Sequence, residues 1–281
     1  MRDILRDFSI PALVTAIEAN YCEFWAFFGR SPQVELHDDP EMIWLTSGIP
    51  HPGFNGVFRT QLAPDDIDAR IGETLAHFKA RRLPMLWWTG PSTRPTNLGE
   101  HLEAHGLTHT AEPGMAVDLL ALNEDVPQPY GLEIEHVRDV ETLKKFGHAA
   151  DIGFGMPDFV GKAILDIEAS LGFGHHLPRH HYVGLLKGEP VTTSTLFLGA
   201  GVAGIYTVAT IPEARRQGIG SAMTLVPLRE ARAMGYRIGV LRSSPMGLNM
   251  YRRLGFKEYC EVSHYLWASE ADQGEEISDG A

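Results

Sequence analysis

Residues 215–220, Arg-Arg-Gln-Gly-Ile-Gly, have the composition of an anion-binding loop. The apolar, β-branched run at 204–210 predicts a strand before this loop, and residues 221–234 predict a helix after it. Backbone N–H groups in the first turn of a helix have no internal partner, and the helix dipole favours negative charge there. Gly218 and Gly220 lack a Cβ, so a phosphate can approach the backbone closely, and the two arginines add charged donors. The segment therefore predicts a phosphate-binding site.

The spacings of common nucleotide-binding loops are not met. A Walker A loop needs four residues between its glycines and a hydroxyl residue after the lysine. The nearest match has five residues between Gly155 and Gly161, and Ala163 follows Lys162. A dinucleotide fingerprint needs a third glycine where Met223 stands.

A second motif, Met-Tyr-Arg-Arg-Leu-Gly-Phe at 250–256, follows about thirty residues later, after a helical run and a short apolar strand at 236–241. The pair of motifs, Arg-x-x-Gly-x-Gly and Tyr-x-x-Leu-Gly-Phe, resembles the GNAT superfamily of acyl-CoA-dependent N-acyltransferases. If the glycines of 215–220 only shaped a tight turn and its arginines were only surface charge, the second motif would be a coincidence.

The elements expected in the second half follow the order of that family. We expect a strand and helix entry at 132–139, a meander of antiparallel strands with a Lys187-Gly188 turn, a helix ended by Gly235, a second helix, and a final strand. The resemblance implies an α/β fold (α+β, with a mixed sheet) in which helices flank a mostly antiparallel central sheet. The expected strands and helices after 139 are 182–187, 191–198, 203–210, 220–234, 236–241, 248–254 and 261–267.

The first half resembles a degenerate copy of the second. Its strand, helix and strand at 84–90, 97–104 and 116–122 match 237–242, 248–254 and 262–267, and 56–62 with 65–81 match the strand and helix around the loop. The phosphate loop is missing, since 61–66 contains no glycine and two acids, and Leu102 stands where Tyr251 falls. An unrelated α/β domain is the alternative. We therefore expect two GNAT-like domains, 1–125 without a cofactor loop and 131–268 with catalysis, joined near 123–130.

The resemblance assigns roles to single residues. Backbone groups of Val208, Ala209 and Thr210 would hold the pantetheine arm, and Tyr251 would be the general acid, because a phenol with a pKa near 10 keeps its proton at neutral pH. Packing beside Phe256 is the alternative for this tyrosine. Ser244 replaces an asparagine of the family, and either donates the same bond or caps the next helix. The full cofactor-binding set is Val208, Ala209, Thr210, Arg215, Arg216, Gln217, Gly218, Ile219, Gly220, Ser221 and Ser244.

No general base stands out. Glu189 is the only acid between 182 and 210 and lies in a turn, so the sequence favours a water relay or one of His180 and His181. With His175 and His176 these histidines resemble a metal cluster, but no neighbouring cysteine or acid completes a set, and no metal is predicted. Acids of the preceding helical stretch either attract a cationic amine or form an exposed face: Asp158, Asp166 and Glu168. The tryptophans Trp87 and Trp88 either line a pocket or fill a core.

Composition narrows the class of protein. The chain has 281 residues, 44% of them hydrophobic, and a net charge of −12. It stays acidic without the five acids of segment 269–281, which we expect to be a disordered tail, so nucleic acid is not an expected partner. No apolar run is long enough to span a membrane, and Cys22 and Cys260 match no metal or redox spacing, which favours a cytoplasmic setting.

These observations predict an N-acyltransferase that moves an acetyl group from acetyl-CoA to a small primary amine by direct attack in a ternary complex. One alternative is a regulatory module that binds acyl-CoA without turnover. Another is a phosphate-dependent nucleotide enzyme. The acceptor and the oligomeric state are left open by the sequence.

Overall fold

The computed structural model describes residues 3–127 and 129–268, and the expected acidic tail at 269–281 lies outside them. The chain divides into two compact units. Unit 1 contains the residues up to Asn20 and Gly114–Tyr259, and unit 2 contains Tyr21–Pro113 together with the described residues from Cys260 on. No helix in the described ranges is both long and apolar enough to cross a bilayer.

Unit 1 is built on a sheet in which four strands form an antiparallel meander. Strand β10 then runs parallel to β9, and the 114–118 part of β5 pairs antiparallel with β10. The predicted meander is confirmed, and its Lys187-Gly188 turn has positive φ at both residues, as a tight hairpin requires. The strands are β6 (Leu132–His136), β7 (Arg179–Leu186), β8 (Glu189–Gly199), β9 (Val202–Thr210), β10 (Ile238–Arg242) and β5 (Thr108–Asp118).

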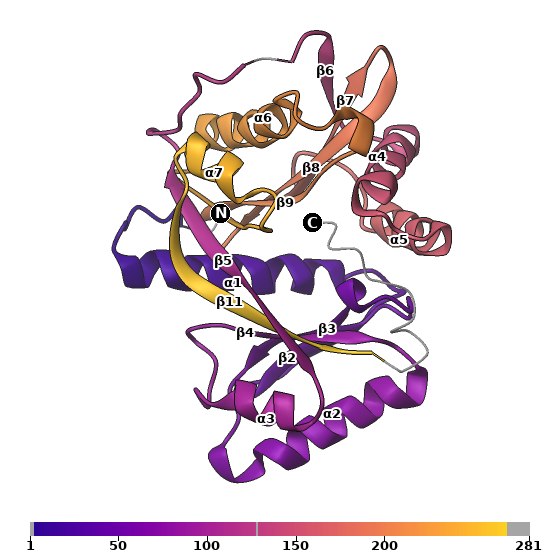
Figure 1. Cartoon of the computed structure of the whole chain (residues 1–281), viewed down its shortest axis with the longest axis vertical. Coiled ribbons are helices and arrows are strands. Elements are labelled where there is room, and N and C mark those ends of the chain that lie inside the picture. Colours follow the sequence, from indigo (N-terminus) through magenta and orange to yellow (C-terminus); the bar gives the residue numbers. More distant parts are fainter. Residues whose placement is uncertain (1–2, 128, 269–281) are drawn as a thin grey trace. The chain divides into compact units, whose positions relative to one another are not determined.

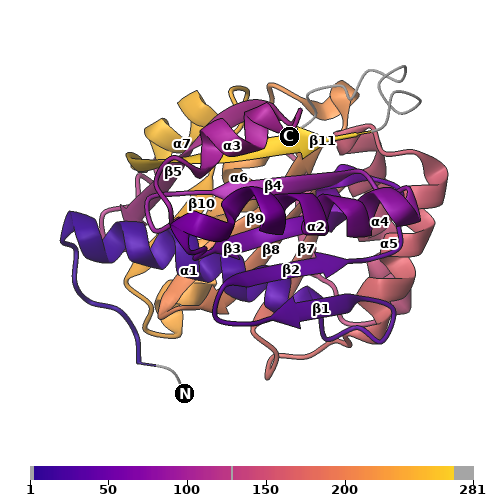
Figure 2. The same cartoon turned by 90° about the horizontal axis from the view of Figure 1, so that it is seen from below.

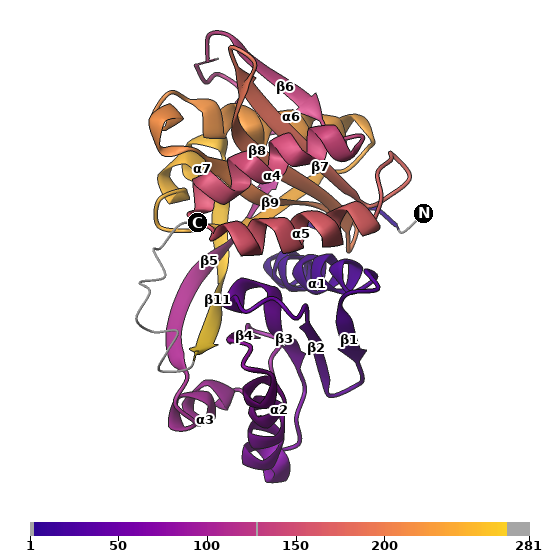
Figure 3. The same ribbon diagram turned by 90° about the vertical axis from the view of Figure 1, so that its right-hand side faces the viewer.

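Helices cover both faces of this sheet. Helices α4 (Val140–Phe154) and α5 (Asp158–Ser170) lie on one face, and α6 (Ile219–Ala233) and α7 (Leu248–Leu254) lie on the other (Figures 1 and 3). Side chains of successive strand residues alternate between the faces. Val183 and Leu185 therefore pack with α4, whereas Tyr182, Leu196 and Ile205 join the core under α6.

Local signals fix where the helices of unit 1 begin and end. Helix α4 starts at a capping box formed by Asp139 and Thr142. Gly235 follows α6 with φ 95°, and Gly255 ends α7 with φ 101°. Both glycines adopt the left-handed conformation that a side chain disfavours, so the two predicted helix ends are confirmed.

Unit 2 repeats the same plan. Its first three strands form an antiparallel meander, β4 runs parallel to β3, and residues 263–267 of β11 pair antiparallel with β4. Helices α2 and α3 lie on one face of this sheet (Figure 2), and the aromatic side chains of α1 pack on β3 and β4. The elements are α1 (Ile10–Phe28), β1 (Glu35–Asp38), β2 (Met42–Thr46), β3 (Asn55–Thr60), α2 (Ile67–Arg81), β4 (Met85–Thr89), α3 (Leu98–Ala104) and β11 (Lys257–Trp267).

The internal repeat predicted from the sequence is present in the structure. In each unit the third strand of the meander pairs in parallel with the next strand over only two residues, Gly56 and Val57 in β3 and Ala203 and Gly204 in β9. A short 3₁₀ turn that begins with a proline follows each of these strands, η2 (Pro64–Asp66) and η3 (Pro212–Ala214). Helix α2 then starts at once, whereas four further residues precede α6.

The last strand of each half of the sequence, β5 in the first half and β11 in the second, pairs with an unexpected partner; we call these two the closing strands. The strand expected at 116–122 is the end of β5, which completes the sheet of unit 1 beside β10. The final strand of the second half, β11, completes the sheet of unit 2 beside β4. Each half of the sequence thus supplies the last strand of the other unit. Helix α1 and the strands β1 and β2 were not predicted.

Candidate functional site

The loop before α6 has the predicted strand–loop–helix order. Strand β9 ends at Thr210, the η3 turn follows, and Gly218 caps the helix with φ 80°. The first hydrogen bond of α6 runs from the amide of Ala222 to the carbonyl of Gly218. Within the described residues, the amides of Ile219, Gly220 and Ser221 have no acceptor. Three N–H groups at a helix N-terminus form a binding site for a phosphate-like anion.

The two arginines of the loop differ in what they contact. Arg215 points inward, where its Nε donates to the carbonyl of Thr210 at 3.0 Å and its Nη2 to the carbonyl of Gly153 at 2.9 Å. It therefore fastens the loop to the end of α4, a role that the sequence did not reveal. Arg216 is exposed, with φ 62°, and supplies the positive charge at the surface of the loop. Gln217 is also exposed, and its Nε2 donates to the carbonyl of Glu213.

The end of β9 presents an open backbone edge. Strand β10 pairs with β9 only at Ala203 and Gly204, so the predicted pantetheine positions, 208–210, have no strand beside them on that side in the described chain. On the other side a bulge shifts the register with β8, and Thr207 has φ 51°. The hydroxyl of Thr192 donates to the carbonyl of Ala209 at 2.7 Å and steadies this edge. An exposed strand edge can bind an extended chain that contains amides, although the carbonyls of Ala209 and Thr210 already accept side-chain hydrogen bonds here.

Tyr251 lies in the core under α6, where only 7% of its surface is exposed. Its ring meets Phe256 edge-on, with 5.8 Å between ring centroids, which is the packing that the sequence left open as an alternative. Burial raises the pKa of Tyr251 far above its usual value, against the effect of a hydrogen bond with Thr224. The hydroxyl therefore carries its proton at neutral pH, as a general acid must. Thr224 in turn donates to the carbonyl of Gly220, which connects the tyrosine to the loop helix.

Ser244 adopts the capping alternative. The amide of Gly247 lies 3.3 Å from the Oγ of Ser244 and 3.1 Å from its carbonyl oxygen, so both oxygens accept at the start of α7. The neighbouring Ser243 is fully buried and donates to the same carbonyl. The Oγ–H of Ser244 has no acceptor among the residues that the structure describes, so this hydroxyl can still donate to a ligand.

The candidate bases His180 and His181 lie on opposite faces of β7. His181 is 7% exposed, with Nδ1 2.7 Å from the hydroxyl of Thr195 and Nε2 3.2 Å from Glu168. Glu168 also forms a buried ion pair with Arg179. Burial lowers the pKa of His181 in spite of the nearby carboxylate. His181 thus belongs to a closed structural network, and the reading of Glu168 as part of an exposed helix face is wrong.

The other candidate residues from the sequence differ in how deeply they are buried. Asp158 and Asp166 are exposed on α5. Trp87 is fully buried and donates to the hydroxyl of Thr60 at 3.0 Å, and Trp88 packs on Tyr21, so this pair fills the core of unit 2. Asp151 on α4 was not singled out from the sequence, yet burial raises the pKa of its carboxyl to about 6. His180 points to the face of β7 opposite His181. There His180 and His175 approach the carboxylate of Glu230 on α6.

Comparison with known proteins agrees with this geometry. Residues 178–258, which contain the loop, the open edge of β9 and Tyr251, match the family model described as an acetyltransferase (GNAT) domain. No sequence among the curated proteins matches the chain.

Solved structures share the fold along nearly the whole chain. A GCN5-related N-acetyltransferase from Kribbella flavida has a TM-score of 0.69 at 18% identity, covering 92% of this chain and 98% of that one. A tandem GNAT protein from the clavulanic acid biosynthesis pathway has a TM-score of 0.56 at 14% identity, covering 93% and 95%. A GCN5-related N-acetyltransferase from Sphaerobacter thermophilus has a TM-score of 0.54 at 16% identity, covering 92% of each chain. Residues 178–258 therefore resemble a GNAT acetyltransferase domain, and the chain as a whole shares the fold of these GNAT structures, a tandem GNAT protein among them.

Proposed function

We propose that unit 1 binds acetyl-CoA and transfers its acetyl group to a small primary amine by direct attack in a ternary complex. The observation that carries the proposal is the row of unpaired backbone donors at 219–221, which follows the open edge of β9 after the η3 turn and the loop 215–218. Diphosphate and pantetheine are adjacent parts of one ligand, and we assign them to these two backbone regions, which one turn and loop connect. The family match over 178–258 supports the same assignment.

The residues of the loop fit such a ligand. The left-handed Gly218 turns the chain so that the next three amides point the same way, and Arg216 adds an exposed charge beside them. The inward bonds of Arg215 fix the loop against α4 and lower the entropy cost of ordering it around a ligand. The corresponding segment of unit 2 has Asp65 and Asp66 before α2, and two acids repel a diphosphate. We therefore assign cofactor binding to the second half, 131–268, and none to 1–125.

Acetyl-CoA, when bound, supplies an activated acetyl group. The 208–210 edge of β9 orients the pantetheine arm, and Ser244 offers a further hydroxyl to it. Tyr251 holds a proton on its hydroxyl for the departing sulfur, and the high pKa caused by burial keeps that proton in place between turnovers. The proton of the amine leaves through water, because Glu189, the one acid in β7, β8 and β9, is exposed at the turn end of β8, and His181 is enclosed by its own partners.

A second function, binding of acyl-CoA without turnover, is favoured by the enclosure of Tyr251 and His181, which are 7% exposed each. Thiol release from acetyl-CoA across a panel of amines separates the two functions. If the protein is an acetyltransferase, we expect CoA release with at least one amine. We also expect Tyr251→Phe to lower kcat by about 100-fold or more while the CoA affinity stays unchanged. The control Tyr259→Phe changes a tyrosine of β11 outside the proposed site and keeps full activity.

Three outcomes decide between the candidates. Saturable CoA binding by calorimetry without release on any amine favours the binding module. Release that is unaffected by Tyr251→Phe removes the tyrosine from the mechanism but keeps the acetyltransferase. A rise in melting temperature with ATP or NAD, and none with CoA, contradicts both functions and supports a nucleotide enzyme.

A further inference from the structure

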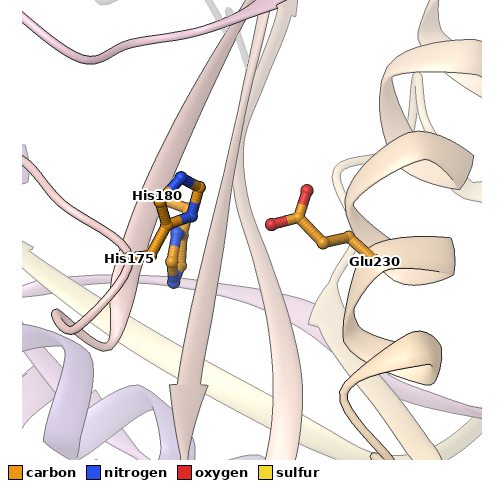
Figure 4. Close-up of side chains that lie close together, drawn as sticks. All are labelled: His175, His180 and Glu230. Carbon is orange, nitrogen blue, oxygen red and sulfur yellow. The ribbon is translucent and has the colours of Figure 1, made fainter.

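Three potential metal ligands from separate elements of unit 1 converge on one point. His175 comes from the segment between α5 and β7, His180 from β7 and Glu230 from α6. One nitrogen of each ring and one carboxylate oxygen all lie within 4.8 Å of one another. In Figure 4 the carboxylate of Glu230 points toward the two imidazole rings.

One of these ligands, His180, is a buried side chain with an unsatisfied ring nitrogen in the described structure. His180 is 6% exposed, and its Nε2 has no hydrogen-bond partner among the described residues. An unsatisfied polar atom inside a protein costs about 1–3 kcal/mol, and such an atom in a native fold calls for an explanation. A metal ion next to this nitrogen would satisfy it, and neutral imidazole is a preferred ligand of zinc.

The carboxylate is held in place by two further side chains. Nε2 of His136 lies 2.9 Å from Oε2 of Glu230, and the hydroxyl of Tyr182 donates to the same oxygen at 2.9 Å. The other carboxylate oxygen has no partner within the described part of the chain. Partners of this kind around a ligating carboxylate orient it toward a metal.

We propose that His175, His180 and Glu230 bind one zinc ion, with water at the fourth position. Two imidazole nitrogens and one carboxylate oxygen are a known zinc ligand set, and the two histidines are separated by four residues, a common ligand spacing. Tetrahedral bonds near 2.0–2.1 Å place ligand atoms about 3.3 Å apart. The cluster must therefore contract, and the exposed His175 is the ligand that has room to move.

The position of the site along α6 separates it from the diphosphate loop. Glu230 follows Gly218 by twelve residues along α6, which is roughly 18 Å at the rise of an α-helix. The ion would therefore lie roughly 18 Å along α6 from the proposed diphosphate site, and we assign it no step in acyl transfer. It cross-links β7 and the segment before it to α6. This inference does not rest on the proposed function, and CoA binding and zinc binding can each fail alone.

Zinc titration of the metal-free full chain against a chromophoric chelator tests the site. The wild type is expected to bind one ion, and cobalt substitution is expected to give the visible absorption of a four-coordinate centre. His175→Ala and His180→Ala are expected to weaken binding by more than about 100-fold, because loss of an outer partner alone costs 10–100-fold. His176→Ala is the matched control, since this exposed neighbour lies outside the cluster, and it should bind as the wild type does.

Tyr182→Phe provides a second test that keeps the packing of a buried ring. Loss of its hydroxyl is expected to weaken zinc binding by about tenfold through the released carboxylate. The proposal is overturned if the wild type competes no better than His175→Ala, or if His176→Ala loses as much affinity as His175→Ala. Because His175 is exposed, its variant should fold even where the buried His180 variant does not.

Discussion

Replacement of Gly218 by alanine tests the geometry of the loop. Gly218 has φ 80°, a conformation that costs a residue with a Cβ roughly 1–2 kcal/mol. The added Cβ would lie 3.2 Å from the carbonyl oxygen of Pro127, which is tighter than ordinary packing. We expect a loss in the free energy of unfolding of about 2 kcal/mol, and a fall in Tm of roughly 4–8 °C for a protein of this size.

Gly220→Ala is the matched control within the same loop. Gly220 lies inside α6 at a normal helical φ, and its added Cβ would approach only Sδ of Met250, the flexible end of a side chain, at 2.9 Å. Alanine is a better helix former than glycine by roughly 0.5–1 kcal/mol, so the stability of this variant should stay close to that of the wild type. Gly218→Asn should recover part of the loss, because asparagine tolerates the left-handed region.

Urea unfolding followed by circular dichroism measures the stability of each variant, and calorimetry measures its affinity for CoA. We expect Gly218→Ala to lose at least tenfold in CoA affinity, because the amides after it are no longer aligned. If Gly218→Ala unfolds at the same urea concentration as the wild type, the left-handed cap before α6 is absent in solution. If its stability falls but CoA affinity does not, the cap exists and the diphosphate binds elsewhere.

Two more variants test the surroundings of the loop. Arg215→Met removes the bonds to the carbonyls of Thr210 and Gly153, and urea unfolding should show a loss of about 1–3 kcal/mol. Burial raises the folded-state pKa of Asp151 to about 6 from 3.8, so its contribution to stability is full below pH 3.8 and is lost as pH rises through 6. Between pH 4 and 8 the free energy of unfolding of the wild type should therefore fall by about 1–2 kcal/mol after solvent screening, and this fall should be absent in Asp151→Asn.

Much of the fold was predictable because its signals are local. The Lys187-Gly188 turn, and the glycines at 235 and 255, each need a positive φ that the sequence provides at that position. Strands β7 and β8 are buried on both faces, so they show no alternation, and a run of mostly β-branched and apolar residues on each side of the turn predicts them instead. These features depend on neighbours within a few residues, so a single sequence is enough to place them.

The missed elements lack such local signals. Helix α1 is apolar around most of its circumference, because its first part packs in unit 1 and its aromatic second part in unit 2. Its periodicity is therefore weak. The exchange of the closing strands is hidden for another reason. The residues of β5 and β11 predict a strand in either unit, and a pattern that specifies a strand does not specify its partner.

The two candidate sites differ in the same way, because one is contiguous in the sequence and the other is assembled from distant residues. The diphosphate loop is contiguous in the sequence, so glycine spacing and charge reveal it, although the inward direction of Arg215 depends on Gly153, far away in the chain. The zinc site was dismissed from the sequence because no acid stands near the histidines. Glu230 lies fifty residues after His180, on a helix that appears from its sequence to carry an ordinary polar face. Only the packing of α6 on the sheet brings its carboxylate near His180, whose Nε2 has no hydrogen-bond partner in the described chain, so long-range topology, rather than local pattern, creates this site.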